Sequence, residues 1–164
     1  MDSVIDLSHS AAADLAKLLA VHEQKIELAE SCTAGMVAAL LGPCPGISAW
    51  FCGSVVTYRE VMKTQWLDVP ATTLDHFSAE SLATSQKMAQ AVLEKTPEAD
   101  FSAAITGHLG PQAPTEADGK IFMAIAIRNQ TEDKLKEYQL EQTKRTMRQH
   151  EAAACLLRFV SQAF

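Results

Sequence analysis

The sequence predicts an α/β fold, a three-layer α/β/α sandwich around a mixed, mostly parallel sheet. Segments typical of strands alternate with segments typical of helices, a pattern that favours a sheet covered on both faces. The last two predicted strands are joined by a short turn, so they must pair antiparallel and make the sheet mixed. The 164 residues suit one domain, and the 48% of hydrophobic residues can fill its core. We therefore expect residues 1–164 to form a single domain.

The N-terminal half predicts three helices and two strands. Ser8 or Ser10 can cap a first helix, in which Leu15, Leu18 and Leu19 recur at helical spacing. Gly42 and the proline after it end the second helix. The order is a strand over 25–29, a helix over 36–41, a loop over 44–48, a buried strand over 50–58 and a short helix over 59–67.

The C-terminal half continues the alternation. A longer helix begins within 78–81 and ends before Pro97, and a short strand over 100–106 leads into a glycine-containing loop over 107–119. Strands over 120–127 and 135–142 follow, the second at the sheet edge. Thr143 or Thr146 can start the last helix. Its predicted core stripe consists of Ala152, Ala153, Leu156, Leu157 and Val160.

Charge and composition exclude several functional classes. The net charge of −6 argues against a nucleic-acid partner, which needs clustered lysine and arginine, but permits a small anionic ligand. No apolar segment reaches the ~18 residues of a membrane span, and the N-terminus lacks the pattern of a secretion signal. The four cysteines form no C-x-x-C pair and have no histidine at zinc spacing. We expect a cytoplasmic protein with reduced thiols, without a metal site or a membrane partner.

The first candidate for chemistry lies where the first strand meets the second helix, in Glu30-Ser31-Cys32-Thr33-Ala34-Gly35. A serine at this junction projects from the carboxyl end of a strand, where open α/β sheets place their sites. The free N–H groups of a helix N-terminus can hold an oxyanion or a phosphate. Helix capping is the commoner role of a serine at such a place, so the segment alone leaves both interpretations open.

The second candidate follows the strand over 50–58. Tyr58 ends that strand, and Lys63 lies about one and a half helical turns later. A lysine that is partly desolvated over the same sheet edge as Ser31 has a lowered pKa and can act as the base of a serine. The alternative is an exposed helical lysine, which is the commoner case.

Two further segments are weaker candidates. After Thr106, Gly107 lets backbone approach a ligand closely, although a plain turn would use the same residue types. His108 can contact a ligand there, but the loop favours a solvated histidine. Arg145 and Arg148 share one face of the last helix and could clamp a carboxylate or phosphate, or be ordinary solvated charges.

Taken together, these segments resemble the C-terminal domain of the CinA family. Residues 29–35, Ala-Glu-Ser-Cys-Thr-Ala-Gly, are similar to its A-E-S-C-T-G-G start, and residues 45–48 to its P-G-S-S loop. Residues 53–58 with Lys63 are similar to its G-x-x-x-x-Y-x-x-x-x-K stretch. Residues 104–111 are similar to its A-x-T-G-x-x-G-P loop. The resemblance runs from about residue 10 to the C-terminus, in family order.

This resemblance implies a nicotinamide-nucleotide amidase, which hydrolyses the carboxamide of nicotinamide mononucleotide to nicotinic acid mononucleotide and ammonia. It implies Ser31 as the nucleophile, Lys63 as its base and Tyr58 as a partner in proton handling. It also implies no cofactor, a small nucleotide as substrate, and a homo-oligomer. The substrate-binding residues that it implies are Cys32, Thr33, Gly35, Thr106, Gly107, Gly110 and Arg145.

Two departures from the family pattern bear on the substrate. Ala34 replaces the first of two glycines. Where the family shows I-A-G-P-G-G-G-T, residues 108–115 read His-Leu-Gly-Pro-Gln-Ala-Pro-Thr, and fewer glycines leave the backbone less free to wrap a phosphate. Two alternatives therefore stand beside the amidase: the same chemistry on a different carboxamide, and a non-catalytic nucleotide-binding or regulatory domain.

Overall fold

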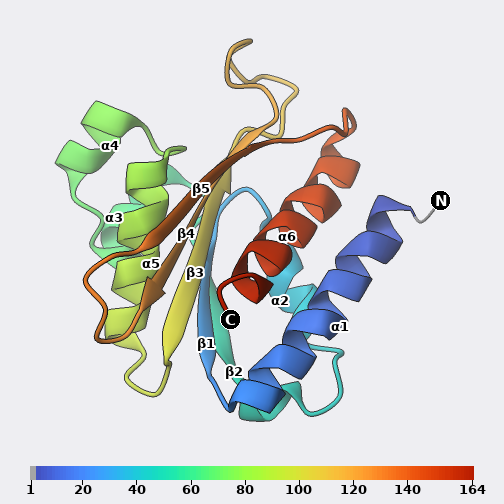
Figure 1. Cartoon of the computed structure of the whole chain (residues 1–164). Helices are drawn as coiled ribbons and strands as arrows, with labels where there is room; N and C mark the ends of the chain where they lie inside the picture. The colour runs from blue at the N-terminus through green and yellow to red at the C-terminus, as the bar shows by residue number, and fades with distance from the viewer. Residues whose placement is uncertain (1–2) are drawn as a thin grey trace.

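The structure, a computed structural model that describes residues 3–164, confirms the predicted α/β sandwich (Figure 1). Its five-stranded sheet has the order β2-β1-β3-β4-β5. The strands are β1 (Ile26–Glu30), β2 (Phe51–Val56), β3 (Phe101–Gly107), β4 (Lys120–Ile127) and β5 (Lys134–Gln139). β1 pairs in parallel with β2 and β3, whereas β4 pairs antiparallel with both β3 and β5. Within the described chain, only β4 therefore runs against the other strands, as expected of a mixed, mostly parallel sheet.

Helices cover both faces of this sheet (Figure 1). One face carries α1 (Val4–His22), α2 (Met36–Leu41) and α6 (Arg145–Ser161); the other carries α3 (Glu60–Leu67), α4 (Ala71–Phe77) and α5 (Leu82–Lys95). A short 3-10 helix, Ile47–Ala49, precedes β2. None of the helices in residues 3–164 is long and apolar enough to cross a lipid bilayer.

Side chains of the strands alternate between two cores, one on each face of the sheet. Large residues such as Leu28 and Ile105 point to α1, α2 and α6, whereas alanines such as Ala29 and Ala104 point to α5. Because alanine side chains are short, α5 lies close to the strands, and Ser102 Oγ of β3 donates to a carbonyl of α5 at 2.6 Å. Burial on both faces explains why the central strands are almost continuously apolar.

Three helices differ from the sequence prediction, and β2 and β5 end earlier than predicted, at Val56 and Gln139. α1 begins earlier, because Ser3 and Asp6 form a reciprocal capping box, and Ser8 is a buried helical residue. α4 was not predicted, since it is short and buries only Leu74. The last helix begins at Arg145, so its N-cap is Lys144 and not a threonine.

The topology places three loops at one edge of the sheet. The carboxyl ends of β1, β2 and β3 lie together because these strands are parallel. The chain leaves β1 toward β2 on one side and leaves β3 toward β4 on the other. Such a reversal of strand order opens a crevice at the carboxyl edge, where ligands of open α/β sheets bind.

Candidate active site

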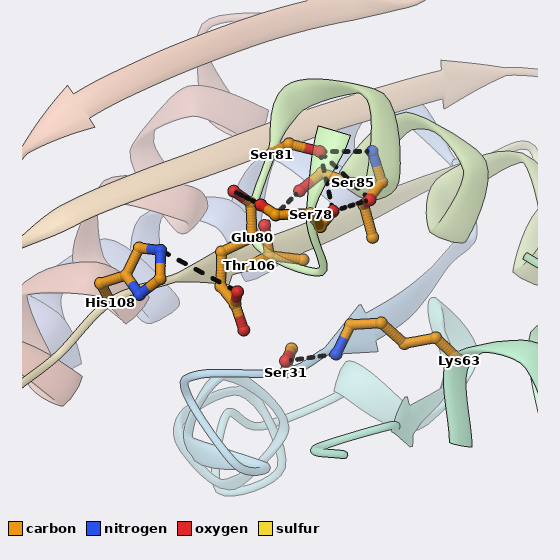
Figure 2. A network of polar contacts seen from close by, with 9 residues as sticks. Ser31, Lys63, Ser78, Glu80, Ser81, Ser85, Thr106 and His108 are labelled. Carbon is orange, nitrogen blue, oxygen red and sulfur yellow. Dashed lines mark hydrogen bonds and ion pairs between the residues drawn. The ribbon is translucent and has the colours of Figure 1, made fainter. Parts of the chain in front are cut away.

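A serine and a lysine meet at this edge of the sheet. Ser31 directly follows β1, and Lys63 lies on α3, with 2.9 Å between Lys63 Nζ and Ser31 Oγ (Figure 2). The amine also donates to the carbonyl oxygen of Thr57 at 2.9 Å. The lysine is fully buried and the serine is 5% exposed. The structure thus brings together the two groups that the sequence analysis proposed as base and nucleophile, and Lys63 is not the exposed helical lysine of the alternative.

The surroundings of Lys63 shift its protonation equilibrium toward the neutral amine. Desolvation by burial lowers the pKa of this amine below its ordinary value, and the negative charges of Glu80 and Glu60 act in the opposite direction. In the described chain, no carboxylate lies within ion-pair distance of the Lys63 amine. A buried amine whose pKa is lowered can accept the proton of an adjacent hydroxyl.

Glu30 holds the turn that follows Ser31, and Ser31 itself is not a helix cap. α2 begins at Met36, and its N-cap Gly35 provides no side-chain cap. Instead, the fully buried Glu30 carboxylate accepts hydrogen bonds of 2.7–3.1 Å from Thr33 Oγ1, Gly35 N, Val37 N, Ala38 N and Ser54 Oγ. Because Glu30 satisfies the N–H groups of the helix, the hydroxyl of Ser31 is left to contact Lys63.

The turn after Ser31 leaves two backbone donors unused. Within the described chain, the N–H groups of Cys32 and Thr33 donate to no other residue, whereas Ser31 N donates to Ile105 O at 3.1 Å. The turn then passes through positive φ values at Ala34 (53°) and Gly35 (92°). Free N–H groups beside a nucleophile can stabilise an oxyanion. Burial raises the pKa of the Cys32 thiol to about 12, which favours the protonated, unreactive form of this thiol.

Ser31 opens into a cavity of about 480 Å³. Its walls come from the turn after β1, the end of β2, the segment before α5, the loop after β3 and the start of α6. The lining residues are Ser31, Cys32, Tyr58, Glu80, Arg145 and the stretch from Gly107 to Ala113. Lys63 is absent from this lining because it lies behind Ser31.

The two arginines of α6 have different roles. Arg145 lines the cavity, donates to the Tyr58 hydroxyl at 2.6 Å and also donates to the carbonyl of Gly110. Arg148 is buried and makes a bidentate pair with Asp118, at 2.7 and 2.8 Å. Arg148 is therefore neither a solvated charge nor a ligand clamp: it fastens the loop after β3 to α6.

Three predicted substrate-binding residues lie behind the cavity wall. Thr106 is fully buried, and its Oγ1 lies 2.9 Å from Ser85 Oγ of α5. Thr33 donates to Glu30, and Gly35 forms the positive-φ end of the turn. By contrast, Gly107 lines the cavity, and a Cβ at this position would lie 2.7 Å from the backbone oxygen of Lys120, so only glycine fits there.

The structure adds two residues that the sequence analysis missed or misjudged. Glu80 was taken only as part of a helix start, yet it lines the cavity. The expected solvated position of His108 is wrong, because its side chain is only 21% exposed and its Nε2 lies 3.9 Å from Glu80 Oε2 (Figure 2). The two residues are distant in sequence, so no local pattern could have paired them.

No metal-binding cluster accompanies the serine–lysine pair: in residues 3–164, no three histidine, cysteine, aspartate or glutamate side chains lie close enough together to hold an ion. The cysteines at positions 32, 44, 52 and 155 are all free thiols.

Fold and site define the class: an α/β protein with a buried serine–lysine pair at the carboxyl edge of its sheet, facing a polar cavity. The chain belongs to the CinA family, whose C-terminal domain matches residues 8–163.

Relatives and solved structures agree with this assignment. A CinA-like protein of Geotalea uraniireducens is 41% identical over 106 residues, which are 63% of this chain and 25% of that protein. A CinA-like protein of Endomicrobium trichonymphae is 34% identical over 134 residues, 80% of this chain and 31% of that protein. The chain thus spans about a quarter to a third of these relatives.

The solved structures match over nearly their whole length. The competence damage-inducible protein A (ComA) of Klebsiella pneumoniae superposes with a TM-score of 0.87 at 28% identity, covering 94% of this chain and 95% of that one. The competence/damage inducible protein CihA of Agrobacterium tumefaciens gives a TM-score of 0.87 at 27% identity, covering 98% and 95%.

Proposed function

We propose that this protein is a cofactor-independent amidohydrolase that converts nicotinamide mononucleotide to nicotinic acid mononucleotide and ammonia. The observation that carries the proposal is the 2.9 Å contact between the buried Lys63 amine and the Ser31 hydroxyl. A serine is a weak nucleophile at neutral pH and needs an adjacent base, and Lys63 is the group that touches it.

The first half-reaction acylates the serine. Neutral Lys63 accepts the hydroxyl proton while Ser31 Oγ attacks the carboxamide carbon. The carbonyl oxygen becomes an oxyanion, which the N–H group of Cys32, in the cavity lining, can stabilise. Protonated Lys63 then returns the proton to the leaving nitrogen. The C–N bond breaks, ammonia departs, and an ester joins Ser31 to the pyridine carbonyl.

The second half-reaction releases the acid. Lys63, neutral again, takes a proton from water, and the hydroxide attacks the ester carbon. Collapse of this second tetrahedral intermediate breaks the bond to Ser31 Oγ, which recovers the proton from Lys63. The product is a carboxylic acid that ionises at neutral pH.

The cavity suits a mononucleotide in size and charge. Its volume of about 480 Å³ falls in the usual range for small-ligand sites. Arg145 uses two of its guanidinium nitrogens on Tyr58 and Gly110, and each terminal nitrogen carries a second N–H. These remaining donors and the positive charge of Arg145 can bind a phosphate. A planar guanidinium can do so through two parallel hydrogen bonds, which a lysine ammonium cannot form.

Ammonia release from nicotinamide mononucleotide by the purified protein tests this proposal. We expect turnover that Ser31→Ala and Lys63→Met each reduce by at least about 1,000-fold, since nucleophile and base act as a unit. Lys87→Met, on the exposed side of α5, is the matched control and should keep full activity. Full activity in Ser31→Ala would end the proposal.

A second candidate is the same reaction on another primary carboxamide. Its support is the cavity wall from Gly107 to Ala113, which departs from the family pattern and so presents a different surface to the ligand. A panel of primary carboxamides, with and without a phosphate, assayed for ammonia release, separates the two candidates.

A further inference from the structure

The geometry points to Glu80 as the residue that recognises the NH₂ group of the substrate's carboxamide and disfavours the carboxylate of the product. This inference rests on the proposed function. It assigns a specificity-determining role to a side chain that the serine–lysine chemistry does not use.

The backbone of Glu80 is rigidly placed before α5. Ser78 Oγ donates to the Glu80 carbonyl at 2.9 Å, and Thr84 Oγ1 donates to the Ser78 carbonyl at 2.6 Å. Ser81 caps α5 through Thr84 N at 3.1 Å. These bonds hold the segment against the helix, so the side chain of Glu80 is the part that is free to meet a ligand.

The carboxylate of Glu80 points across the cavity toward Ser31 (Figure 2). Its contact in the described chain is the ring of His108, whose Nε2 lies 3.9 Å away, beyond hydrogen-bond distance. No described residue donates a hydrogen bond to the carboxylate, although the side chain is only 31% exposed. A carboxylate can accept about four hydrogen bonds. Glu80 therefore offers unused acceptors to whatever fills the cavity.

The negative charge of Glu80 acts on the groups beside Ser31. It raises the pKa of Lys63 against the larger lowering by desolvation, and it contributes to the raised pKa of the Cys32 thiol. Because an electrostatic effect of this kind falls with distance, Glu80 lies close enough to act on a group bound at Ser31.

A primary carboxamide matches this arrangement from both sides. Its carbonyl oxygen needs a donor, which the turn after Ser31 supplies at Cys32, and its two N–H groups need acceptors, which Glu80 supplies. Hydrolysis replaces the NH₂ by a negatively charged oxygen. That oxygen then faces the Glu80 carboxylate, and like charges in a shielded cavity repel each other. Glu80 thus favours the amide over the acid and promotes release of the product.

The experiment measures binding without turnover. Calorimetry on Ser31→Ala protein gives the dissociation constants of nicotinamide mononucleotide and nicotinic acid mononucleotide. We expect the amide to bind at least about tenfold more tightly than the acid, because repulsion between the acid's carboxylate and Glu80 weakens binding of the acid by about that factor. In Ser31→Ala/Glu80→Gln the preference should fall to within about threefold, chiefly through tighter binding of the acid, because glutamine can donate to a carboxylate.

Glu60→Gln in the same background is the matched control. Glu60 also raises the pKa of Lys63 but lies outside the cavity lining, so its loss should leave the amide preference intact. A preference that survives Glu80→Gln, or that falls equally in both variants, overturns the inference, as does failure of either mononucleotide to bind.

Turnover by the unmodified protein separates this outcome from the proposed function. If Glu80→Gln removes the preference but the unmodified protein releases no ammonia, the recognition role stands and the amidase fails. If ammonia is released and the preference survives Glu80→Gln, the amidase stands and the recognition role fails. An unchanged melting temperature in Glu80→Gln shows that the variant is folded.

Discussion

Replacing Glu30 by glutamine tests whether this carboxylate holds the nucleophile turn together. One of its oxygens accepts from Thr33 Oγ1, Gly35 N and Val37 N, and the other accepts from Ala38 N and Ser54 Oγ. Glutamine keeps one oxygen but turns the other into NH₂. The serine hydroxyl can rotate to accept from this group, whereas the Ala38 N–H cannot.

The expected loss of stability follows from this count. One buried N–H without an acceptor costs about 1–3 kcal/mol, and the remaining bonds lose their charge assistance. We expect Glu30→Gln to lower the free energy of unfolding by about 2–4 kcal/mol, or the melting temperature by roughly 5–15 °C for a domain of this size.

Urea denaturation followed by circular dichroism measures this change. The midpoint should fall while the slope of the free energy against urea stays the same, because the fold is unchanged. Glu94→Gln, at an exposed position on α5, is the control and should stay within about 0.5 kcal/mol of the unmodified protein. A Glu30→Gln variant as stable as this control would refute the reasoning.

Three further predictions concern the site and the sheet. Since Lys63 must be neutral to act as a base and desolvation lowers its pKa from 10.5, kcat/KM should rise with pH and level off below pH 10.5. Glu60→Gln removes a charge that raises this pKa and should move the rise to lower pH; a flat profile in both proteins would contradict the role. Ala34→Gly should raise the free energy of unfolding by about 0.5–1 kcal/mol in urea titrations, because alanine is strained at a φ of 53°; a loss would show that the turn tolerates Cβ. Burial raises the pKa of Glu27 to about 7 from 4.5, so the folded state keeps its proton and stability should fall as pH rises between these values. Glu27→Gln should remove this slope and be more stable by about 1–3 kcal/mol above pH 7; urea midpoints at pH 5 and 8.5 check it, and an unchanged slope would contradict it.

Much of the fold could be predicted because its signals are local. The apolar runs of β1, β3 and β4 and the stripe from Ala152 to Val160 follow the periods of strands and helices, and the short turn before β5 requires an antiparallel hairpin. Helix starts were less predictable: several serines and threonines can cap, and only the partner Asp6 selects Ser3. α4 escaped because a seven-residue helix with one buried side chain has no clear period.

For the site, the sequence by itself determined which residue types stand at the strand ends: Ser31 after β1, Tyr58 after β2 and Gly107 at the end of β3. Their order along the chain was enough to suggest a shared edge and a family. Only the tertiary structure decided that Lys63 is buried against Ser31, that Glu30 caps α2 in place of Ser31, and that Arg148 is tied to Asp118.

The physical reason is that burial and contact depend on which segments the sheet order brings together. Nothing in the local sequence around residues 31 and 63, or around residues 80 and 108, identifies the neighbour that each of them contacts in the fold. From sequence alone, a lysine on a short helix is expected to be exposed to solvent. Only the packing of α3 against the end of β1 shows that Lys63 is buried. The sequence therefore determines which residue types are present, and the fold determines their burial and their contacts.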